Sequence, residues 1–248
     1  MFPLKDNIPT DRTPYVTIAL IVVNVLAYFL WQKGGLSLGD PSSEAYMCNV
    51  GEFGAVPREF TDPDFSLGSC GGAEASRWLT PFTSMFMHGG LLHLGGNMLF
   101  LWIFGNNVED AMGPLKYIAF YVIGGLAALA AQVAVGPSSE VPTIGASGAV
   151  AAVLGGYILL HPRARVVTVI FIVFFFTIIE IPALIMLGLW FAQQLVFGAL
   201  DFTTPTADGG GGVAYFAHIG GFVFGLAAIK LFAGRRRDRR RQFDPFGR

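Results

Sequence analysis

The segment Ile144-Gly-Ala-Ser147-Gly-Ala-Val-Ala-Ala-Val-Leu-Gly-Gly-Tyr-Ile-Leu-Leu160 decides how the rest of this sequence is interpreted. It carries no charged residue, and its length approaches the roughly 20 residues with which a helix crosses a bilayer. Ser147 stands out in it, because polar side chains at membrane depth are costly and tend to mark functional cavities. The segment therefore predicts a transmembrane helix that carries a candidate functional serine.

Stretches of the same character lie on both sides of this segment. Apolar residues make up 53% of the chain and charged residues 13%, whereas about 25% of the residues are charged in typical soluble proteins. We therefore predict an all-α membrane protein, built as one bundle of six transmembrane helices. The predicted spans are residues 15–32, 90–106, 115–135, 144–160, 181–200 and 213–232.

These spans divide the chain into three parts. Residues 1–14 are a polar cytoplasmic leader, residues 15–232 are the membrane domain with an outer loop at 33–89, and residues 233–248 are a basic tail. The first span is not followed by the small-residue cleavage site of a secretory signal, so we expect it to be retained.

The run from Val166 to Leu200 is too long for one helix, and Glu180 and Pro182 interrupt it. Its first part is rich in β-branched and aromatic residues. We place the fifth span after Pro182, because proline is poorly tolerated inside a helix. Residues 166–179 are then expected to form an interfacial or re-entrant segment on the cytoplasmic side.

Basic residues predict the orientation, because cytoplasmic loops are enriched in Lys and Arg. With six spans both termini lie on one side, and that side collects thirteen basic residues, whereas the other has only Lys33, Arg58 and Arg77. We therefore expect a multi-pass protein of the cell (inner) membrane, with both termini in the cytoplasm. The arginine-rich tail is interpreted as a topology anchor beside the lipid bilayer, and no nucleic-acid partner is expected.

Cys48 and Cys70 both fall in the predicted outer loop. In an oxidising compartment they could form one disulfide, but the sequence does not establish that their Cα atoms come close enough to pair. The sequence contains no Cys-x-x-Cys or His-Glu-x-x-His metal motif.

Four polar side chains fall at similar depths beneath the outer face of the predicted bundle. Counted from the predicted helix starts, Ser147 lies three residues in, His218 about five and Asn97 about seven. At 1.5 Å per residue these positions are roughly 5–10 Å deep. His93 lies one turn above Asn97 on the same helix face. Each residue alone has an ordinary explanation in packing or interhelical hydrogen bonding, but together they are the residue types that acyl transfer needs.

The chemistry assigns a role to each of these side chains. A serine hydroxyl is a weak nucleophile and needs a base within hydrogen-bond reach; His218 is the candidate, and burial should favour its neutral form. Neither the fourth nor the sixth span has an acidic partner, so Ser147 and His218 would act as a dyad. N–H groups at the helix start, with donors from Asn97 and His93, could stabilise the oxyanion.

Five motifs carry a resemblance to a known family. They are Phe86-Met-His88-Gly-Gly-Leu-Leu-His93-Leu-Gly-Gly-Asn97, Phe104-Gly-Asn-Asn-Val-Glu109-Asp110, Ala111-Met-Gly113, Gly145-Ala-Ser147-Gly148-Ala and Ala217-His218-Ile-Gly-Gly221. In this order and in these helices the set is highly specific. Over about residues 15–232 the chain resembles the rhomboid family of intramembrane serine proteases, in its six-helix bacterial form.

The resemblance implies roles for the matching residues. Ser147 matches the nucleophile and His218 the general base, whereas His93, Asn97 and Gly145 belong to the oxyanion side of the site. His88 matches another family histidine, for which a structural or gating role is expected.

Two positions depart from the family pattern. Arg77 and Trp78 stand in the reverse of the expected Trp-Arg order, so no contact is assigned to Arg77. Ala151 follows Ser147 by one turn, at a position where relatives often carry an aromatic residue that packs on the catalytic imidazole. How His218 is held is therefore left open by the sequence.

The remaining polar residues receive structural roles. Glu109 and Asp110 are expected in a cytoplasmic turn far from the chemistry, and Gln193 and Gln194 are expected to form interhelical hydrogen bonds, with a role near the lateral opening as the alternative. Residues 201–212 would form an outer loop above the site, either a lid or a simple connector.

These observations predict an intramembrane serine endopeptidase that hydrolyses peptide bonds in or near transmembrane segments. The resemblance implies single-span membrane proteins as substrates, small residues at the cut, and no metal or organic cofactor. The alternative is a non-catalytic rhomboid-like escort that binds membrane proteins. A small transporter is disfavoured because the chain has no internal repeat, and an aspartyl protease because no Asp lies inside a span. The sequence defines no oligomeric state.

Overall fold

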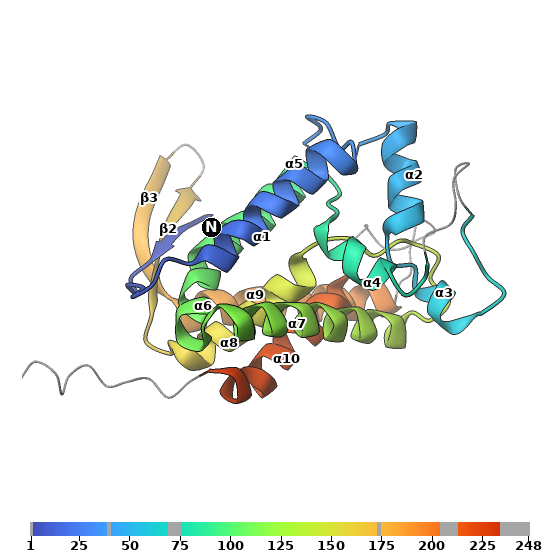
Figure 1. Ribbon diagram of the computed structural model, residues 1–248. Coiled ribbons are helices and arrows are strands. Elements are labelled where there is room, and N and C mark those ends of the chain that lie inside the picture. The colour runs from blue at the N-terminus through green and yellow to red at the C-terminus, as the bar shows by residue number, and fades with distance from the viewer. Residues whose placement is uncertain (1, 39–40, 69–75, 173–174, 204–212, 234–248) are drawn as a thin grey trace, which may run out of the picture.

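The structure is a computed structural model that describes residues 2–38, 41–68, 76–172, 175–203 and 213–233 (Figure 1). Within these residues the long helical segments follow the predicted spans, which confirms the all-α membrane bundle as the fold class. They are α1 with the π-helical η1 (Tyr15–Leu26, Ala27–Trp31), the consecutive α5, η3 and α6 (Leu91–Phe100, Leu101–Gly105, Asn106–Met112), α7 (Pro114–Val135), α8 (Ser147–Leu160), α9 (Ala183–Thr203) and α10 (Tyr215–Phe232).

The helices differ in length. Three of those in the described residues, α7, α9 and α10, are long and apolar enough to cross a membrane, whereas α8 and the combined α1 and η1 are shorter apolar helices. The second predicted span is divided into α5, η3 and α6, because a π-helical stretch interrupts its regular α-helix.

Several helices differ from their predicted spans by a few residues at one end, and the local backbone explains two of these differences. The second span stays helical to Met112 rather than ending near residue 106, and Gly113, with φ of 81°, then separates it from α7. The fourth span begins at Ser147 rather than at residue 144, because Gly145 has φ of 126°, outside the helical region. Ser147 is therefore the first residue of its helix and not the fourth, which corrects the predicted depth.

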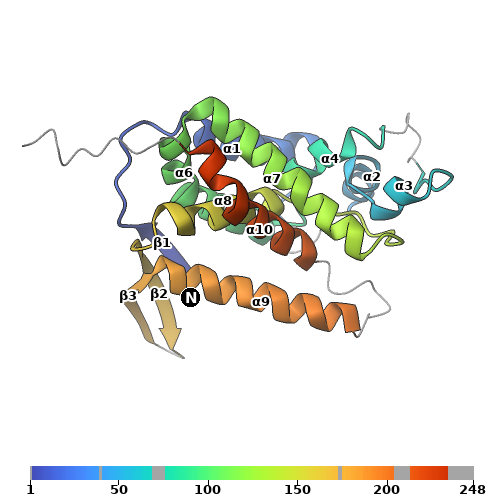
Figure 2. The same cartoon turned by 90° about the horizontal axis from the view of Figure 1, so that it is seen from below.

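Glycines bring α8 and α10 unusually close together. A methyl group at Gly221 would overlap the carbonyl oxygen of Gly148, and one at Gly225 would overlap that of Ala152. On the α8 side, a methyl group at Gly155 would overlap the carbonyl oxygen of Phe222. The close-packing role predicted for Gly221 and Gly225 is confirmed, and the two helices cross in backbone contact (Figure 2).

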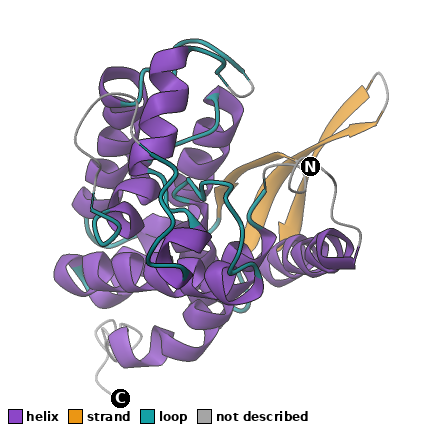
Figure 3. Ribbon diagram, turned by 90° about the vertical axis from the view of Figure 1, so that its right-hand side faces the viewer, coloured by secondary structure: helices purple, strands orange, loops and turns teal. Residues whose placement is uncertain are grey.

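A three-stranded antiparallel sheet, absent from the prediction, lies at one end of the bundle (Figure 3). Its strands are β1 (Phe2–Asp6), β2 (Arg165–Ile172) and β3 (Phe175–Pro182), in that order. In the segment 166–179, expected to be interfacial or re-entrant, the described residues belong to the paired strands β2 and β3, because β-branched and aromatic residues favour strands. We call this end of the bundle, which also holds Gly113, the sheet end.

Polar side chains tie the sheet end to the bundle. Asp6 accepts hydrogen bonds from the hydroxyl of Tyr157 at 2.5 Å and from the side-chain amide of Asn107 at 2.7 Å. Glu109 accepts the backbone N–H and the hydroxyl of Thr17, both at 2.8 Å, which satisfies an N–H group in the first turn of α1. Glu109 therefore has a structural role, as predicted, but it lies within α6 and not in a turn, because the second span stays helical to Met112.

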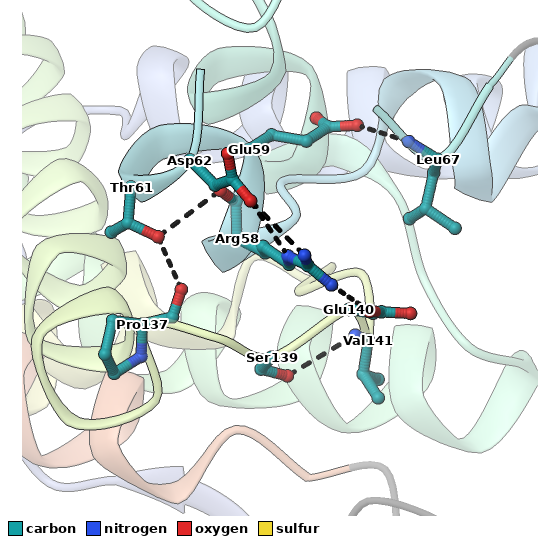
Figure 4. A network of polar contacts seen from close by, with 9 residues as sticks. All are labelled: Arg58, Glu59, Thr61, Asp62, Leu67, Pro137, Ser139, Glu140 and Val141. Carbon is teal, nitrogen blue, oxygen red and sulfur yellow. Dashed lines mark hydrogen bonds and ion pairs between the residues drawn. The ribbon is translucent and has the colours of Figure 1, made fainter. Parts of the chain in front are cut away.

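Short helices cover the opposite end, which we call the cap end. They are α2 (Glu44–Phe53), α3 (Pro57–Thr61), α4 (Thr80–Thr83) and the 3₁₀ turn η2 (Ser84–Phe86). Arg58 on α3 pairs with Asp62 and with Glu140 in the loop between α7 and α8 (Figure 4). The hydroxyl of Thr61 donates to the carbonyl of Pro137 at 2.6 Å in the same network. The cap is thereby attached to the loop that leads to Ser147.

The disulfide that the sequence left open between Cys48 and Cys70 falls partly outside the described residues. Cys48, on α2, is disulfide-bonded. Cys70 is the other cysteine of the sequence and lies outside the described residues.

Candidate active site

Ser147 and His218 meet at the cap end of the contact between α8 and α10. The hydroxyl oxygen of Ser147 lies 2.8 Å from Nε2 of His218, which is a hydrogen-bonding distance. Ser147 is the first residue of α8, and His218 lies in the first turn of α10. Both side chains are partly buried, so the pair is only partly exposed.

The neighbouring helices fix this distance. The glycine contacts described above hold the backbones of α8 and α10 together immediately below the pair. The side-chain oxygen of Gln132 on α7 accepts the backbone N–H of Ala217 at 3.2 Å, which anchors the start of α10. The sequence therefore positions the hydroxyl and the imidazole through backbone packing rather than through long side chains.

His93 lies beside the pair, and its protonation can be inferred from its partner. The backbone N–H of Gly89 donates to Nδ1 of His93 at 3.2 Å, so Nδ1 is the acceptor and the proton of a neutral imidazole is on Nε2. A Cβ atom at Gly145 would lie 2.9 Å from Nε2 of His93 and 3.4 Å from the hydroxyl oxygen of Ser147. Glycine at 145 thus leaves open a space that an N–H donor and a hydroxyl both border.

Further donors lie close to this space. Asn97 is buried one turn below His93, and its side-chain Nδ2 has no hydrogen-bond partner among the described residues. At the start of α8, the first intrahelical bond to a preceding residue runs from the N–H of Val150 to the carbonyl of Ala146. The N–H groups before Val150 lack intrahelical acceptors, as at any helix N-terminus. The arrangement could stabilise a negative charge that develops beside Ser147.

His88 packs against His93. Its ring is fully buried and packs edge-on against the ring of His93, with the ring centroids 5.2 Å apart. The side chain of Gln32 forms two hydrogen bonds of 2.8 Å with the backbone of His88. Burial lowers the pKa of His88 to about 3, so it is neutral and places no charge beside His93.

The structure adds two residues on α9 that were not predicted to contact the site. The side-chain oxygen of Gln194 lies 2.8 Å from Nδ1 of His218, and the ring of Trp190 lies beside the imidazole, with centroids 5.8 Å apart and planes tilted by 37°. The expected interhelical hydrogen bond of Gln194 therefore exists, but its partner had not been foreseen. The sequence does indicate that Trp190 and Gln194 face the same neighbour, because residues four apart on a helix share one face.

The position of Ala151 explains why an α9 aromatic residue lies beside His218. Ala151 is fully buried, and its Cβ is 3.3 Å from where a Cβ of Gly221 would lie. A larger side chain at 151 would have to enter the close contact between α8 and α10. The aromatic ring beside the imidazole comes instead from Trp190 on α9.

The other predicted features have separate outcomes. Residues 204–212, which include most of the proposed lid, lie outside the described residues. Arg77 donates to the backbone carbonyls of Glu59 and Pro63, each at 3.0 Å, and so stabilises the cap loop. Within the described part of the chain, no three His, Cys, Asp or Glu residues gather as metal ligands would.

Comparison with known proteins gives a consistent family assignment. A profile described as Rhomboid domain matches residues 75–235, more than half of the chain. Similar proteins include "Rhomboid protein 1, mitochondrial" of Saccharomyces cerevisiae, 30% identical over 154 residues, which are 58% of this chain and 38% of that protein. "RHOMBOID-like protein 12, mitochondrial" of Arabidopsis thaliana is 30% identical over 179 residues, 65% of this chain and 49% of the relative. The human "Presenilin-associated rhomboid-like protein, mitochondrial" is 28% identical over 162 residues, 64% of this chain and 36% of the relative. The matched region thus spans less than half the length of each of these relatives.

Proposed function

The chain belongs to the rhomboid family, and from this premise we propose that it is an intramembrane serine endopeptidase. The observation that carries the proposal is the 2.8 Å contact between the Ser147 hydroxyl and Nε2 of His218. A serine and a base within hydrogen-bond reach are what nucleophilic acyl transfer requires.

In the proposed reaction, the hydroxyl of Ser147 attacks the carbonyl carbon of a peptide bond while Nε2 of His218 takes the hydroxyl proton. The tetrahedral intermediate collapses to an acyl-enzyme, and His218 returns the proton to the leaving amine. Water then enters, gives a proton to His218 and attacks the ester. His218 passes this proton to the oxygen of Ser147 as the new carboxyl end leaves, which restores the hydroxyl. Each step uses His218 alternately as base and acid.

The oxyanion of the tetrahedral intermediate would lie beside Gly145. The Nε2–H of His93 borders this space, and its tautomer is fixed by the Gly89 N–H. The buried Nδ2 of Asn97 and the first N–H groups of α8 supply further donors. Donors that are already oriented cost no reorganisation when charge develops, and they make a large contribution to catalysis.

The proposed substrates are single-span membrane proteins that are cut in or near the transmembrane segment. Ser147 and His218 meet at the cap end, whereas thirteen of the basic residues in the sequence belong to the sheet end and the tail. By the positive-inside rule, the sheet end would face the cytoplasm of a cell (inner) membrane, and cleavage would occur in the outer half of the bilayer.

The test is cleavage of a single-span reporter by the full chain in proteoliposomes. The unmodified chain is compared with Ser147→Ala and His218→Ala, and a fluorophosphonate probe reports whether Ser147 is reactive. We expect cleavage and labelling in the unmodified chain, and the loss of both in Ser147→Ala. Thermal unfolding of each variant controls for the fold.

Two other outcomes would revise the proposal. Cleavage that survives in Ser147→Ala would rule out the serine mechanism. A folded chain that cuts none of several reporters, but retains them in a stable complex, would instead support the non-catalytic escort of membrane proteins.

A further inference from the structure

Gln194 is a buried amide on a helix whose other buried residues are small or apolar. Only 5% of its surface is exposed, and the remaining buried residues of α9 are Ala183, Met186, Leu187 and Gly198. An amide in such surroundings is costly unless both of its ends are hydrogen-bonded. The partners of Gln194 therefore indicate why this residue is at this position.

Both ends of the Gln194 amide have partners, and the partners determine its orientation. Its Nε2 donates to the backbone carbonyl of Trp190 at 3.3 Å, whereas its Oε1 lies 2.8 Å from Nδ1 of His218. Reversing the amide would bring its oxygen against the carbonyl oxygen of Trp190, where neither atom can donate. The oxygen of Gln194 is therefore the atom that faces the imidazole.

This orientation selects one tautomer of His218. An amide oxygen can only accept, so Nδ1 of the imidazole must carry the proton. Nε2 is then left with its lone pair directed at the Ser147 hydroxyl, 2.8 Å away. The opposite tautomer would place a proton between Nε2 and the hydroxyl oxygen, and His218 could not then act as a base.

The same contact acts during proton transfer. When Nε2 takes the serine proton, the imidazole becomes positively charged, and a hydrogen bond from its Nδ1–H to the Gln194 oxygen becomes charge-assisted and stronger. Trp190, one turn earlier on α9, lies beside the same ring and restricts its rotation. One face of α9 thus contacts the imidazole at Nδ1 and along the ring.

We infer that Gln194 is a positioning residue, the third member of a Ser147-His218-Gln194 chain of hydrogen bonds, and that it holds the imidazole in its base-competent tautomer. The inference rests on the proposed function for its catalytic consequence. The tautomer itself is a property of the resting protein and can be measured whether or not the protein cleaves a reporter.

The kinetic test uses the full chain in proteoliposomes with the single-span reporter. Gln194→Met keeps the length of the side chain but removes the acceptor, and Gln193→Met makes the same change at the exposed neighbouring residue. We expect Gln194→Met to lower kcat by about 10- to 100-fold with little change in KM, which corresponds to a lost hydrogen bond to a group that becomes charged. Gln193→Met should keep the kcat of the unmodified chain.

Gln194→Glu separates positioning from packing. A carboxylate still accepts from Nδ1 and also stabilises the imidazolium, so this variant should regain most of the kcat lost in Gln194→Met. It should also move the acidic limb of the pH–rate profile to higher pH. An unchanged kcat in Gln194→Met, or an unchanged pH profile in Gln194→Glu, would overturn the inference.

The structural test does not depend on cleavage. The chain has four histidines, so ¹⁵N-histidine labelling with His218→Ala as the assignment control should isolate the signals of His218. We expect a protonated Nδ1 in the unmodified chain and a mixture of tautomers in Gln194→Met. If the unmodified chain cuts no reporter, the proposed function fails while this measurement still decides the role of Gln194. A single Nδ1–H tautomer that persists in Gln194→Met would reject that role.

Discussion

The two flanks of α10 are built in opposite ways. Toward α8 the contact is backbone against backbone, because Gly221 and Gly225 leave no side chain between the helices. Toward α9 the contact is made by large side chains, with Phe191 stacked on Phe222 at a centroid distance of 4.3 Å and Trp190 beside His218. The first flank permits almost no adjustment, whereas the second can adjust by rotamer changes.

This difference separates two requirements of the proposed site. The distance between Ser147 and His218 depends on how closely α8 and α10 approach, which is set by the glycine contact. The rotation and the tautomer of the imidazole depend on Gln194 and Trp190, which belong to α9. A change on the α8 flank should therefore abolish the geometry, and a change on the α9 flank should only weaken it.

Among changes to the two flanks of α10, the largest effect is expected from Gly221→Ala. The new methyl group would overlap the carbonyl oxygen of Gly148, which belongs to the backbone and cannot rotate away. The helices must separate, at a cost of about 1–3 kcal/mol for overpacking. A shift of about 1 Å at the site would lower the cleavage rate on the order of 100-fold. Reporter cleavage and thermal unfolding measure the two effects.

Gly188→Ala is the matched control for this substitution. Gly188 lies within α9, and a methyl group there would meet nothing within 4 Å. Activity and stability close to those of the unmodified chain are expected. If both glycine variants behave alike, the close contact with α8 is not what holds the site together.

A smaller effect is expected from Trp190→Leu on the opposite flank. Aromatic ring contacts contribute about 0.5–1.5 kcal/mol beyond burial, which corresponds to roughly a twofold to tenfold fall in kcat. The comparison is Phe197→Leu, which removes an α9 aromatic that contacts Tyr215 at a centroid distance of 5.8 Å and not His218. Equal losses in kcat would show that α9 acts only through its general packing, and a loss confined to Trp190→Leu would localise the effect at the imidazole.

The sequence was most informative where one physical rule dominates. Length and hydropathy located the spans, and Pro182 correctly marked the start of the fifth, since α9 begins at Ala183. Buried polar residue types selected Ser147, His218, His93 and Asn97 as site candidates. The structure brings the first two into hydrogen-bonding distance and places His93 beside them.

The sequence was least informative where a contact joins distant segments. Nothing local indicates that residues 2–6 pair with residues 166–169, because a strand of 5 residues is too short to show a periodicity of its own. The contact between Gln194 and His218 likewise depends on the relative rotation of α9 and α10. Hydropathy determines that a helix spans the membrane, but its rotation is set by packing against neighbouring helices.

The smallest effect is expected from Asp6→Asn at the sheet end, far from both flanks of α10. Burial raises the pKa of Asp6 above its usual 3.8, although its hydrogen bond with Tyr157 acts in the opposite direction. When the pKa of a carboxyl group is higher in the folded state than in the unfolded state, its contribution to the free energy of unfolding is complete below the unfolded-state pKa. That contribution is lost as the pH rises through the folded-state pKa. The asparagine does not titrate. The stability of the unmodified chain relative to Asp6→Asn should therefore be greatest in acid and fall toward neutral pH.

Unfolding midpoints measured in detergent from acidic to neutral pH would follow this difference, with the exposed Asp64→Asn as the control. Reporter cleavage at neutral pH should remain unchanged in Asp6→Asn, because the α8 contact and the α9 contact of α10 are both intact. If the difference in stability between Asp6→Asn and the unmodified chain does not vary with pH, burial does not raise the pKa of Asp6. A loss of cleavage without a loss of stability would mean that the sheet end is coupled to the site, and the two flanks of α10 would then no longer account for its geometry on their own.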